Sequence, residues 1–272
     1  MKADLHVHST ASDGTLHPAE LVDRALQRGI DVLAIADHDS VSGLAEAAFA
    51  ASGTPLILVP ACELSASLGT YDVHVLAYFV DPDSQELLDE LRTLRDDRLQ
   101  RATDMVEALN LDGIPITMDQ VLEFSAGGAV GRSHIARALV DAGHADTVTA
   151  AFQRYIGRDR KYYHAKRSRS PVEVVAAIRG FGAVPVLAHP GVTGADELIP
   201  DMVDGGLLGI EAYHADHSAQ QRDRYARMAQ DLGLIATGGT DYHGPHSHNP
   251  ELGSIDVPET SVRALLALDP RI

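Results

Sequence analysis

Asp4-Leu5-His6-Val7-His8-Ser9 opens the chain with two histidines two positions apart. The alternating pattern over residues 2–8 predicts a β-strand, in which residues i and i+2 point to the same face of the sheet. We therefore expect the side chains of His6 and His8 to lie side by side. Such a pair is a candidate for metal binding, although a lone histidine at a strand end is more often a hydrogen-bonded structural residue.

Strand-like and helix-like segments alternate along the rest of the chain, which is typical of a parallel α/β protein. Besides residues 2–8, the expected strands are residues 31–36, 56–61, 73–80, 183–188, 207–213 and 234–238. The expected helices among them are residues 18–28, 42–51, 172–179 and 219–232. Seven strand–helix units in 272 residues predict an incomplete (β/α)7 barrel.

The alternation is interrupted after the fourth expected strand. Residues 84–109 form one long expected helix with an apolar stripe at helical spacing. The stripe consists of Leu87, Leu88, Leu91, Leu94, Leu99, Met105, Val106 and Leu109. Short helical patterns and loops follow up to residue 170. We therefore expect residues 1–83 and 171–272 to form the barrel, and residues 84–170 to form the long helix and a small helical insertion over the active site.

Composition narrows the classes of function. The formal net charge of −17 argues against general binding of long nucleic acids. The single cysteine, Cys62, argues against an internal disulfide and a cysteine-rich zinc site. No apolar stretch is long enough for a membrane helix, and the early strand leaves no room for a signal peptide. We therefore expect a cytoplasmic protein without a membrane partner.

Histidine, aspartate or glutamate stands at the end of nearly every expected strand. After His6 and His8, these candidates are Asp13, Asp37-His38-Asp39, Glu63, His189, Glu211, His214, Asp241 and His243, with His74 near the start of the fourth strand. Barrel strands end at one rim, where barrel enzymes carry their active sites. Without cations, so many buried ionisable groups would cost several kcal/mol each. The pattern therefore predicts a metal centre, although it leaves open whether His74 lies at the same rim. Imidazole with carboxylate ligands suits Mn²⁺, Fe²⁺ or Zn²⁺.

These motifs resemble those of the polymerase and histidinol phosphatase (PHP) family, in family order and over almost the whole chain. They are residues 4–9 with Ser12-Asp13-Gly14, then Ala36-Asp37-His38-Asp39, Glu63, His74, Ala188-His189-Pro190 and Thr240-Asp241-Tyr242-His243. The resemblance implies a distorted (β/α)7 barrel with three divalent metal ions, for which we favour Mn²⁺. The ligands that it implies are His6, His8, Asp13, His38, Glu63, His74, His189, Asp241 and His243.

The resemblance also implies how the centre works. One ion would take His6, His8, Glu63 and Asp241, a second Glu63, His74 and His189, and a third Asp13, His38 and His243. A metal-bridging hydroxide would be the nucleophile, and the ions would offset the charge of the transition state. His214 would donate a proton to the leaving oxygen. Orientation of a metal ligand is the alternative role for His214.

The insertion carries a second signal, for an anion. Gly131-Arg132-Ser133-His134 precedes a helical pattern, and the free N–H groups at a helix start bind anions. Residues 154–169 hold seven of the chain's 22 basic residues, namely Arg154, Arg158, Arg160, Lys161, Lys166, Arg167 and Arg169. For most of this cluster we prefer a solvated loop paired with acidic neighbours. We predict that Arg132, Ser133, His134 and Lys161 bind substrate.

An anion pocket apart from a metal centre predicts a substrate with two phosphates. The Gly-Arg-Ser-His segment and the place of the insertion resemble a PHP subgroup of 3′,5′-nucleoside bisphosphate phosphatases and 5′→3′ exoribonucleases acting on short RNA. We therefore expect a phosphoric monoester hydrolase that removes the 3′-phosphate of a pAp-like nucleotide and leaves the 5′-monophosphate. The low aromatic content, 5%, favours a small substrate over a long strand.

Three alternatives stay open. The first is a 5′→3′ exoribonuclease on short 5′-phosphorylated RNA, and the second is a histidinol-phosphate phosphatase, which the basic insertion disfavours. The third is a non-catalytic metal-binding regulatory module, which the full set of ligands disfavours. The sequence leaves open the base preference, the physiological metal and the oligomeric state.

Overall fold

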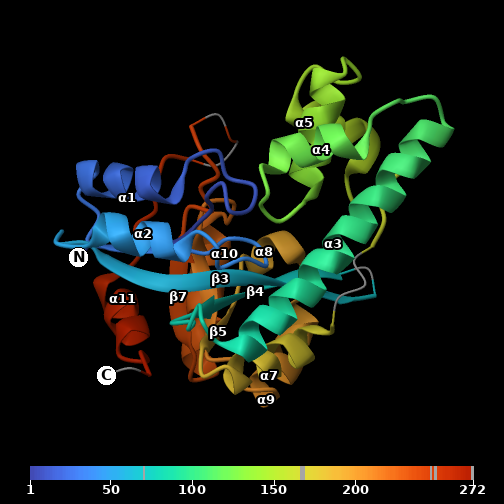
Figure 1. Ribbon diagram of the computed structural model, residues 1–272. Helices are drawn as coiled ribbons and strands as arrows, with labels where there is room; N and C mark the ends of the chain where they lie inside the picture. The colour runs from blue at the N-terminus through green and yellow to red at the C-terminus, as the bar shows by residue number, and fades with distance from the viewer. Residues whose placement is uncertain (70, 166–168, 246, 248–249, 271–272) are drawn as a thin grey trace.

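The computed structural model of the chain describes residues 1–69, 71–165, 169–245, 247 and 250–270. Its strands lie in one sheet in chain order: β1 (Ala3–Val7), β2 (Val32–Ile35), β3 (Ile57–Leu68), β4 (Tyr71–Tyr78), β5 (Val184–Leu187), β6 (Gly209–His214) and β7 (Ile235–Gly239). The segment after β7 meets β1, because the His8 N–H donates to the Tyr242 carbonyl and the Asp241 N–H donates to the His6 carbonyl, each at 2.9 Å. The predicted (β/α)7 barrel is therefore confirmed as a nearly closed sheet (Figure 1).

Helices surround this sheet. They are α1 (Pro18–Gln27), α2 (Leu44–Ala51), α7 (Pro171–Gly180), the short α8 (Pro190–Thr193), α9 (Ile199–Asp204), α10 (Ala219–Asp231) and α11 (Glu259–Leu266), with a 3-10 turn, η2 (Asp196–Leu198). A proline in the first turn and a capping box begin both α1 and α7, which fixes where each helix starts. In the described part of the chain, every helix is too short or too polar to cross a membrane.

The direction of β4 corrects the expectation of an all-parallel sheet. β3 continues past Glu63 to Leu68 and pairs with β4 as an antiparallel hairpin, with Ser65 opposite His74. β4 is also antiparallel to β5. The link from Leu68 to Tyr71 is too short for the crossover that parallel strands need. The start of β4, with His74, therefore lies at the rim where the other strands end.

The insertion after β4 leaves the barrel along α3 (Gln85–Leu111) and carries a group of short helices at its far end (Figure 1). These are α4 (Met118–Ser125), α5 (Arg132–Asp141), α6 (Val148–Ala151) and a π-helical turn, η1 (Phe152–Ile156). They pack on α3 and on one another around an apolar cluster of their own. We refer to residues 112–165 as the head.

α3 connects two hydrophobic cores. Its first turns pack in a core of the barrel, and its last turns pack in the core of the head. Leu99, which was expected on the apolar stripe, is exposed, whereas Arg98 and Arg101 are only 8% and 9% exposed. The spacing from Leu94 through Arg98 and Arg101 to Met105 keeps these four residues on one helix face. Two arginines therefore occupy the stripe where the barrel meets the head.

The closure of the barrel depends on a glycine in β7. A Cβ atom on Gly239 would lie 2.5 Å from the His6 Cβ and 2.6 Å from the His6 backbone nitrogen. We expect Gly239→Ala to push β7 away from β1 and to lower the free energy of unfolding by about 1–3 kcal/mol, measured by urea denaturation. Gly180→Ala, whose Cβ would meet open space, is the matched control. Equal stability of the two variants would contradict the close packing of β1 and β7.

Candidate metal centre

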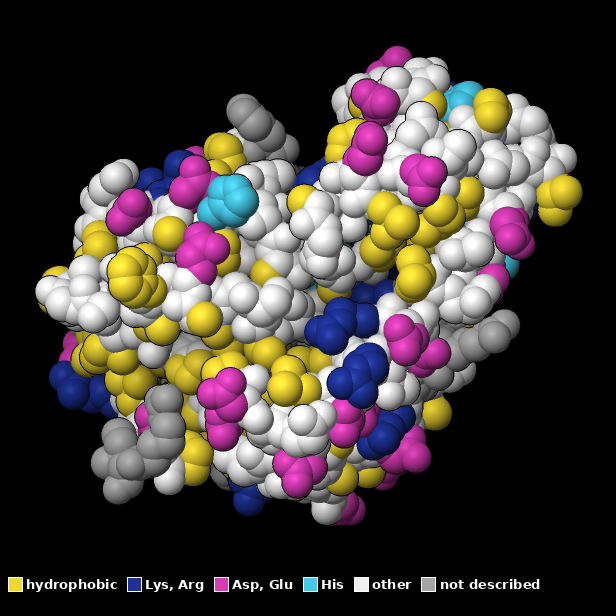
Figure 2. All heavy atoms as spheres, viewed as in Figure 1, with side chains coloured by type: hydrophobic (Ala, Val, Ile, Leu, Met, Phe, Trp, Pro, Cys, Tyr) yellow, Lys and Arg dark blue, Asp and Glu magenta, His cyan; other side chains and the backbone are white. Residues whose placement is uncertain are grey.

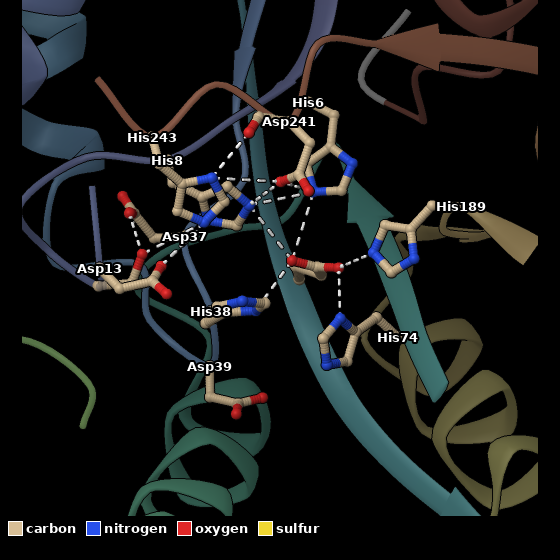
Figure 3. A network of polar contacts seen from close by, with 12 residues as sticks. His6, His8, Asp13, Asp37, His38, Asp39, His74, His189, Asp241 and His243 are labelled. Atoms are coloured by element: carbon tan, nitrogen blue, oxygen red, sulfur yellow. Dashed lines mark hydrogen bonds and ion pairs between the residues drawn. The ribbon is translucent and has the colours of Figure 1, made fainter. Parts of the chain in front are cut away.

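The nine side chains predicted as metal ligands meet at one rim of the barrel, and Figure 3 shows most of them pointing toward one another. Strands supply three of them, and the segments that follow strands supply the other six. The strand residues are His6 on β1, Glu63 on β3 and His74 on β4. The others are His8 and Asp13 after β1, His38 after β2, His189 after β5, and Asp241 and His243 after β7.

Glu63 lies at the centre of the group and is fully buried. Three imidazole nitrogens lie 2.9–3.4 Å from its Oε2, and two lie 2.9–3.1 Å from its Oε1. The nitrogens belong to His6, His8 and His38 on Oε2, and to His74 and His189 on Oε1. One carboxylate that contacts five imidazoles in this way has the position of a bridging ligand.

Two further carboxylates contact the histidines on the β1 side of the rim. Asp241 Oδ1 lies 2.9 Å from His8 Nε2 and 3.6 Å from both His6 Nε2 and His243 Nδ1. Asp13 Oδ1 lies 3.2 Å from His243 Nε2 and 4.0 Å from His8 Nδ1. His8 thus faces both carboxylates.

The donor atoms fit bound cations. His6 Nε2 and His8 Nε2 are 3.1 Å apart, and Glu63 Oε2, Asp13 Oδ1 and His38 Nδ1 are buried without a hydrogen bond to the described residues. Lone pairs that converge in this way are what a divalent ion binds. Four groups have ligand atoms within 4.8 Å of one another: His8, Asp13, His38 and His243; His6, His8 and Asp241; His6, Glu211 and His214; and His38, Glu63 and His74.

The electrostatics of the centre keep its carboxylates ionised. Burial would raise the pKa of Glu63, but the neighbouring imidazoles, His38 foremost, hold that pKa well below its usual range. Burial likewise opposes the shifts of Asp13 and Asp241, whose pKa values His243 and other histidines hold well below the usual range. Against the effect of burial, Asp13 and Asp241 raise the pKa of His243 to about 10. A metal ion that binds there must displace protons.

Glu211, which was not among the predicted ligands, orients two of them. Its Oε1 lies 3.1 Å from His6 Nδ1, and its Oε2 accepts a hydrogen bond of 2.9 Å from the His189 N–H. Burial would raise the pKa of Glu211, but His6 and His214 lower it to about 2. The contact fixes the His6 ring so that Nε2 faces the centre. Its place on β6, three residues before His214 at the end of the strand, is the sequence signal that identifies Glu211.

Asp37 plays a similar part for the loop that carries Asp13. Its carboxylate accepts hydrogen bonds from the Ser9 hydroxyl at 2.6 Å and the Ser12 hydroxyl at 2.5 Å. The Ser9 N–H donates to the same carboxylate at 2.8 Å. Asp37 therefore holds residues 9–12 in the turn that presents Asp13 to the rim.

Backbone strain is concentrated at the same rim. The backbone φ angles of Asp39, His189 and Asp241 are positive, at 48°, 27° and 52°. Residues other than glycine rarely adopt positive φ angles. Such conformations cost on the order of 1–3 kcal/mol and persist where function requires them. The strain at His189 and Asp241 is part of what aims two predicted ligands into the centre.

Two of the residues predicted to bind substrate lie beside the metal centre. Ser133, in the first turn of α5, donates a hydrogen bond of 2.9 Å to Asp13 Oδ2. The Arg132 guanidinium lies 3.4 Å from Asp72 Oδ2, and Asp72 Oδ1 lies 3.7 Å from His74 Nε2. Ser133 thus contacts a predicted ligand directly, and Arg132 reaches one through Asp72.

The other two predicted residues are placed differently. His134 is fully buried, its Nδ1 accepts a hydrogen bond from the Gly131 N–H, and burial lowers the pKa of His134 to about 4. Lys161 pairs with Asp112, just past the far end of α3, so the structure does not bring Lys161 to the metal centre. Two further members of the predicted basic cluster, Lys166 and Arg167, lie outside the described residues.

His214, the predicted proton donor, is fully buried at the end of β6. Its Nδ1 accepts a hydrogen bond of 3.1 Å from the Asp216 N–H, so a neutral ring carries its proton on Nε2. That Nε2 lies 3.7 Å from Asp241 Oδ2. The tautomer suits a proton donor, but His214 also groups with His6 and Glu211, so its catalytic role stays a prediction.

Sequence reasoning missed the two buried arginines of α3. Arg98 pairs with the Asp39 carboxylate and donates to the Ser65 hydroxyl at 2.8 Å. Arg101 donates from Nε to the His164 carbonyl at 2.6 Å. Figure 2 shows Lys and Arg side chains gathered where the barrel meets the insertion. The signal in the sequence is that both arginines stand at apolar-stripe positions of a long helix.

A barrel with these ligands at its rim is the framework of a metal-dependent hydrolase. The PHP domain profile matches residues 4–163, more than half of the chain. The chain therefore belongs to the PHP-domain family and is a metal-dependent phosphoesterase.

Relatives agree with this assignment. A 3′,5′-nucleoside bisphosphate phosphatase from Chromobacterium violaceum is 35% identical over 92% of this chain and 90% of its own length. A 5′-3′ exoribonuclease from Haemophilus influenzae is 34% identical over 90% of each chain. A crystal structure from Bifidobacterium adolescentis, assigned as a metal-dependent phosphoesterase, is 36% identical, has a TM-score of 0.88 and covers 98% of this chain and 96% of its own.

The contact between Glu211 and His6 predicts a role in metal affinity. Glu211→Gln keeps the shape of the side chain but removes its charge, so it should weaken metal binding about 10–100-fold. The measurement is a Mn²⁺ titration followed by calorimetry. Glu251→Gln, at an exposed carboxylate that pairs with Arg24, is the matched control. Unchanged affinity in Glu211→Gln would show that the His6 ring needs no such partner.

The raised pKa of His243 predicts that metal uptake releases protons. Because the pKa is about 10 without metal, the imidazole is protonated at pH 7 and must lose its proton to bind an ion. Metal affinity should therefore rise with pH between about pH 6 and 10. Calorimetry in two buffers of different ionisation enthalpy measures the released protons directly. Equal heats in the two buffers would contradict the prediction.

Proposed function

We propose that this protein hydrolyses the 3′-phosphate of nucleoside 3′,5′-bisphosphates and leaves the 5′-monophosphate. The metal centre would take the phosphate that is cleaved, and a cationic site between α3 and the head would hold the other. The observation that carries the proposal is a buried guanidinium near the centre, Arg101, which forms no direct ion pair within the described part of the chain and feels the charge of Asp72 only from farther away.

The surroundings of Arg101 suit a phosphate. Its Nη2 is buried and makes no hydrogen bond within the described part of the chain. The guanidiniums of Arg101 and Arg132 lie 5.2 Å and 5.3 Å from the centroid of the same Tyr163 ring. Burial and the nearby charge of Arg132 lower the pKa of Arg101 to about 10. A bound phosphate would offset this repulsion and accept the free N–H groups.

Side-chain contacts connect the cationic site to the metal centre. Arg132 contacts Asp72, which in turn contacts His74 at the rim. A Cβ atom built on Gly131, the residue before Arg132, would lie 3.6 Å from Arg98 Nη1 and 4.0 Å from Asp13 Oδ2, so the start of α5 lies near both α3 and a predicted metal ligand. These contacts support a small substrate that spans the cationic site and the centre.

In the proposed reaction, the rim residues would hold three divalent ions, for which we favour Mn²⁺ on the imidazole and carboxylate ligands. Those ions would supply an activated water and offset charge on the phosphoryl oxygens. His214 would donate the proton on its Nε2 to the leaving 3′-oxygen. We place the reaction in the cytoplasm, because a chain with a single cysteine forms no internal disulfide and so suits a reducing compartment.

Hydrolysis of short 5′-phosphorylated RNA is the second candidate, since one relative is an exoribonuclease. The same cationic site would then hold the 5′-phosphate while a 3′ phosphodiester is cut. Product analysis separates the two candidates, because only the exoribonuclease releases nucleotides from a short RNA. A histidinol-phosphate substrate, with its cationic end, is disfavoured by the guanidiniums at the site.

Substitution of Arg101 tests the two-phosphate proposal. Arg101→Met and Arg132→Met should each lower kcat/KM for pAp about 10–100-fold, as expected for a charged hydrogen bond worth about 1.5–3 kcal/mol. Turnover of an aryl phosphate, which has one phosphate, should change little. Steady-state phosphate release with the Mn²⁺-loaded protein measures both substrates.

Arg154→Met, an exposed arginine of the head, is the matched control and should affect neither substrate. Equal losses on pAp and the aryl phosphate in Arg101→Met would overturn the two-phosphate site. Lys161→Ala tests the remaining sequence prediction in the same assay. A protein that hydrolyses no phosphomonoester or phosphodiester would favour the regulatory module.

A further inference from the structure

The head touches the barrel through the loop that carries a predicted metal ligand. The Ala129 N–H of the head donates to the Ala11 carbonyl at 3.3 Å. A Cβ atom on Gly128 would lie 2.8 Å from the Thr10 carbonyl oxygen and 2.9 Å from the Ala11 backbone. Only glycine at position 128 therefore permits the head to approach residues 10–11 this closely. These residues belong to the loop that leads to Asp13.

Two side chains of α5 continue the contact onto Asp13 itself. Ser133 Oγ donates to Asp13 Oδ2 at 2.9 Å, and Arg137 Nη2 donates to the Asp13 backbone carbonyl at 3.0 Å. The other carboxylate oxygen, Oδ1, points to His243 at 3.2 Å and is buried without a hydrogen bond to the described residues. The head thus holds one oxygen of Asp13 and leaves the other for the group formed with His8, His38 and His243.

We propose that docking of the head and binding of a cation at Asp13, His8, His38 and His243 stabilise each other. Ser133 and Arg137 are positioning residues in this arrangement, since they act on the metal through Asp13. With the head docked, the Asp13 carboxylate is already oriented, so a cation binds without the cost of ordering that side chain. The inference rests on the metal centre and is independent of the proposed substrate.

Thermodynamic linkage makes the effect of docking on cation binding reciprocal. If docking raises the affinity for the cation by some factor, the cation raises the docking equilibrium by the same factor. The head carries α5, with Arg132 of the cationic site at its first position. Loading of this one ion therefore also orders α5 and the backbone of Arg132, whichever substrate the protein takes.

Metal titration of variants at the contact tests the proposal without any substrate. Wild-type protein freed of metal is titrated with Mn²⁺, and bound equivalents are counted by calorimetry and elemental analysis. Asp13→Asn should lose one equivalent. Ser133→Ala and Gly128→Ala should each weaken that same equivalent about 10–100-fold and leave the others unchanged. Gly128→Ala alters no polar group, so it isolates the docking contact.

Hydrogen exchange measures the reciprocal effect. In the wild type, saturating Mn²⁺ should slow exchange of the α5 amides, and in Ser133→Ala the slowing should be lost. Ser133→Thr keeps the hydroxyl and should restore both affinity and protection. Gly180→Ala, the same chemical change in open space on α7, should behave as the wild type. Circular dichroism and thermal unfolding of each variant confirm that it folds.

Two results would overturn the proposal. One is that Asp13→Asn binds as many Mn²⁺ equivalents as the wild type, because then no ion uses Asp13. The other is that Ser133→Ala and Gly128→Ala bind every equivalent with wild-type affinity, which would leave the head without influence on the centre. Neither result bears on the two-phosphate substrate, which is tested by turnover.

Discussion

The burial of the Glu63 carboxylate among five imidazoles is the interaction on which the rest of the structure depends. A buried charge of this kind costs several kcal/mol unless opposite charges and hydrogen bonds surround it. The barrel meets this demand by bringing a histidine or a carboxylate from every strand, or from the segment that follows it, to one rim. The strained backbone at His189 and Asp241, and the outer carboxylates Asp37 and Glu211, follow from the need to aim those side chains at one point.

The sequence was a good guide to the barrel and to the residues that meet at its rim, because both depend on local pattern. Alternation gives the strands, and the end of a strand is where a side chain reaches the rim. The position of His74 depends instead on the direction of β4, which follows from its antiparallel pairing with β3. The run Leu64-Ser65-Ala66-Ser67-Leu68 alternates strictly and leads into Gly69, which is the signature of a hairpin rather than of a strand end.

The arginines of α3 were missed for a different physical reason. An apolar stripe predicts which face of a helix is buried but assumes that charges avoid that face. Arg98 and Arg101 are buried where two hydrophobic cores leave a gap, and the Asp39 carboxylate compensates one of the two charges. Lys161 was predicted to bind substrate because it belongs to a basic cluster in the sequence. In the structure it pairs with Asp112, just past the far end of α3. Charge counts along a sequence carry no information on which acidic partner each cation finds in space.

The contact between the two ends of the barrel has a consequence for the order in which the protein forms. The β3–β4 hairpin joins neighbours in the sequence, so it can assemble while the chain is still being synthesised. Asp4 and Thr240, by contrast, pair across 236 positions, and the same closure brings Asp241 to His6 and His8. A growing chain on the ribosome therefore cannot bring Asp241 to His6 and His8 until its last strand has emerged, and a prematurely terminated product that ends at β7 lacks two of the nine predicted ligands, Asp241 and His243.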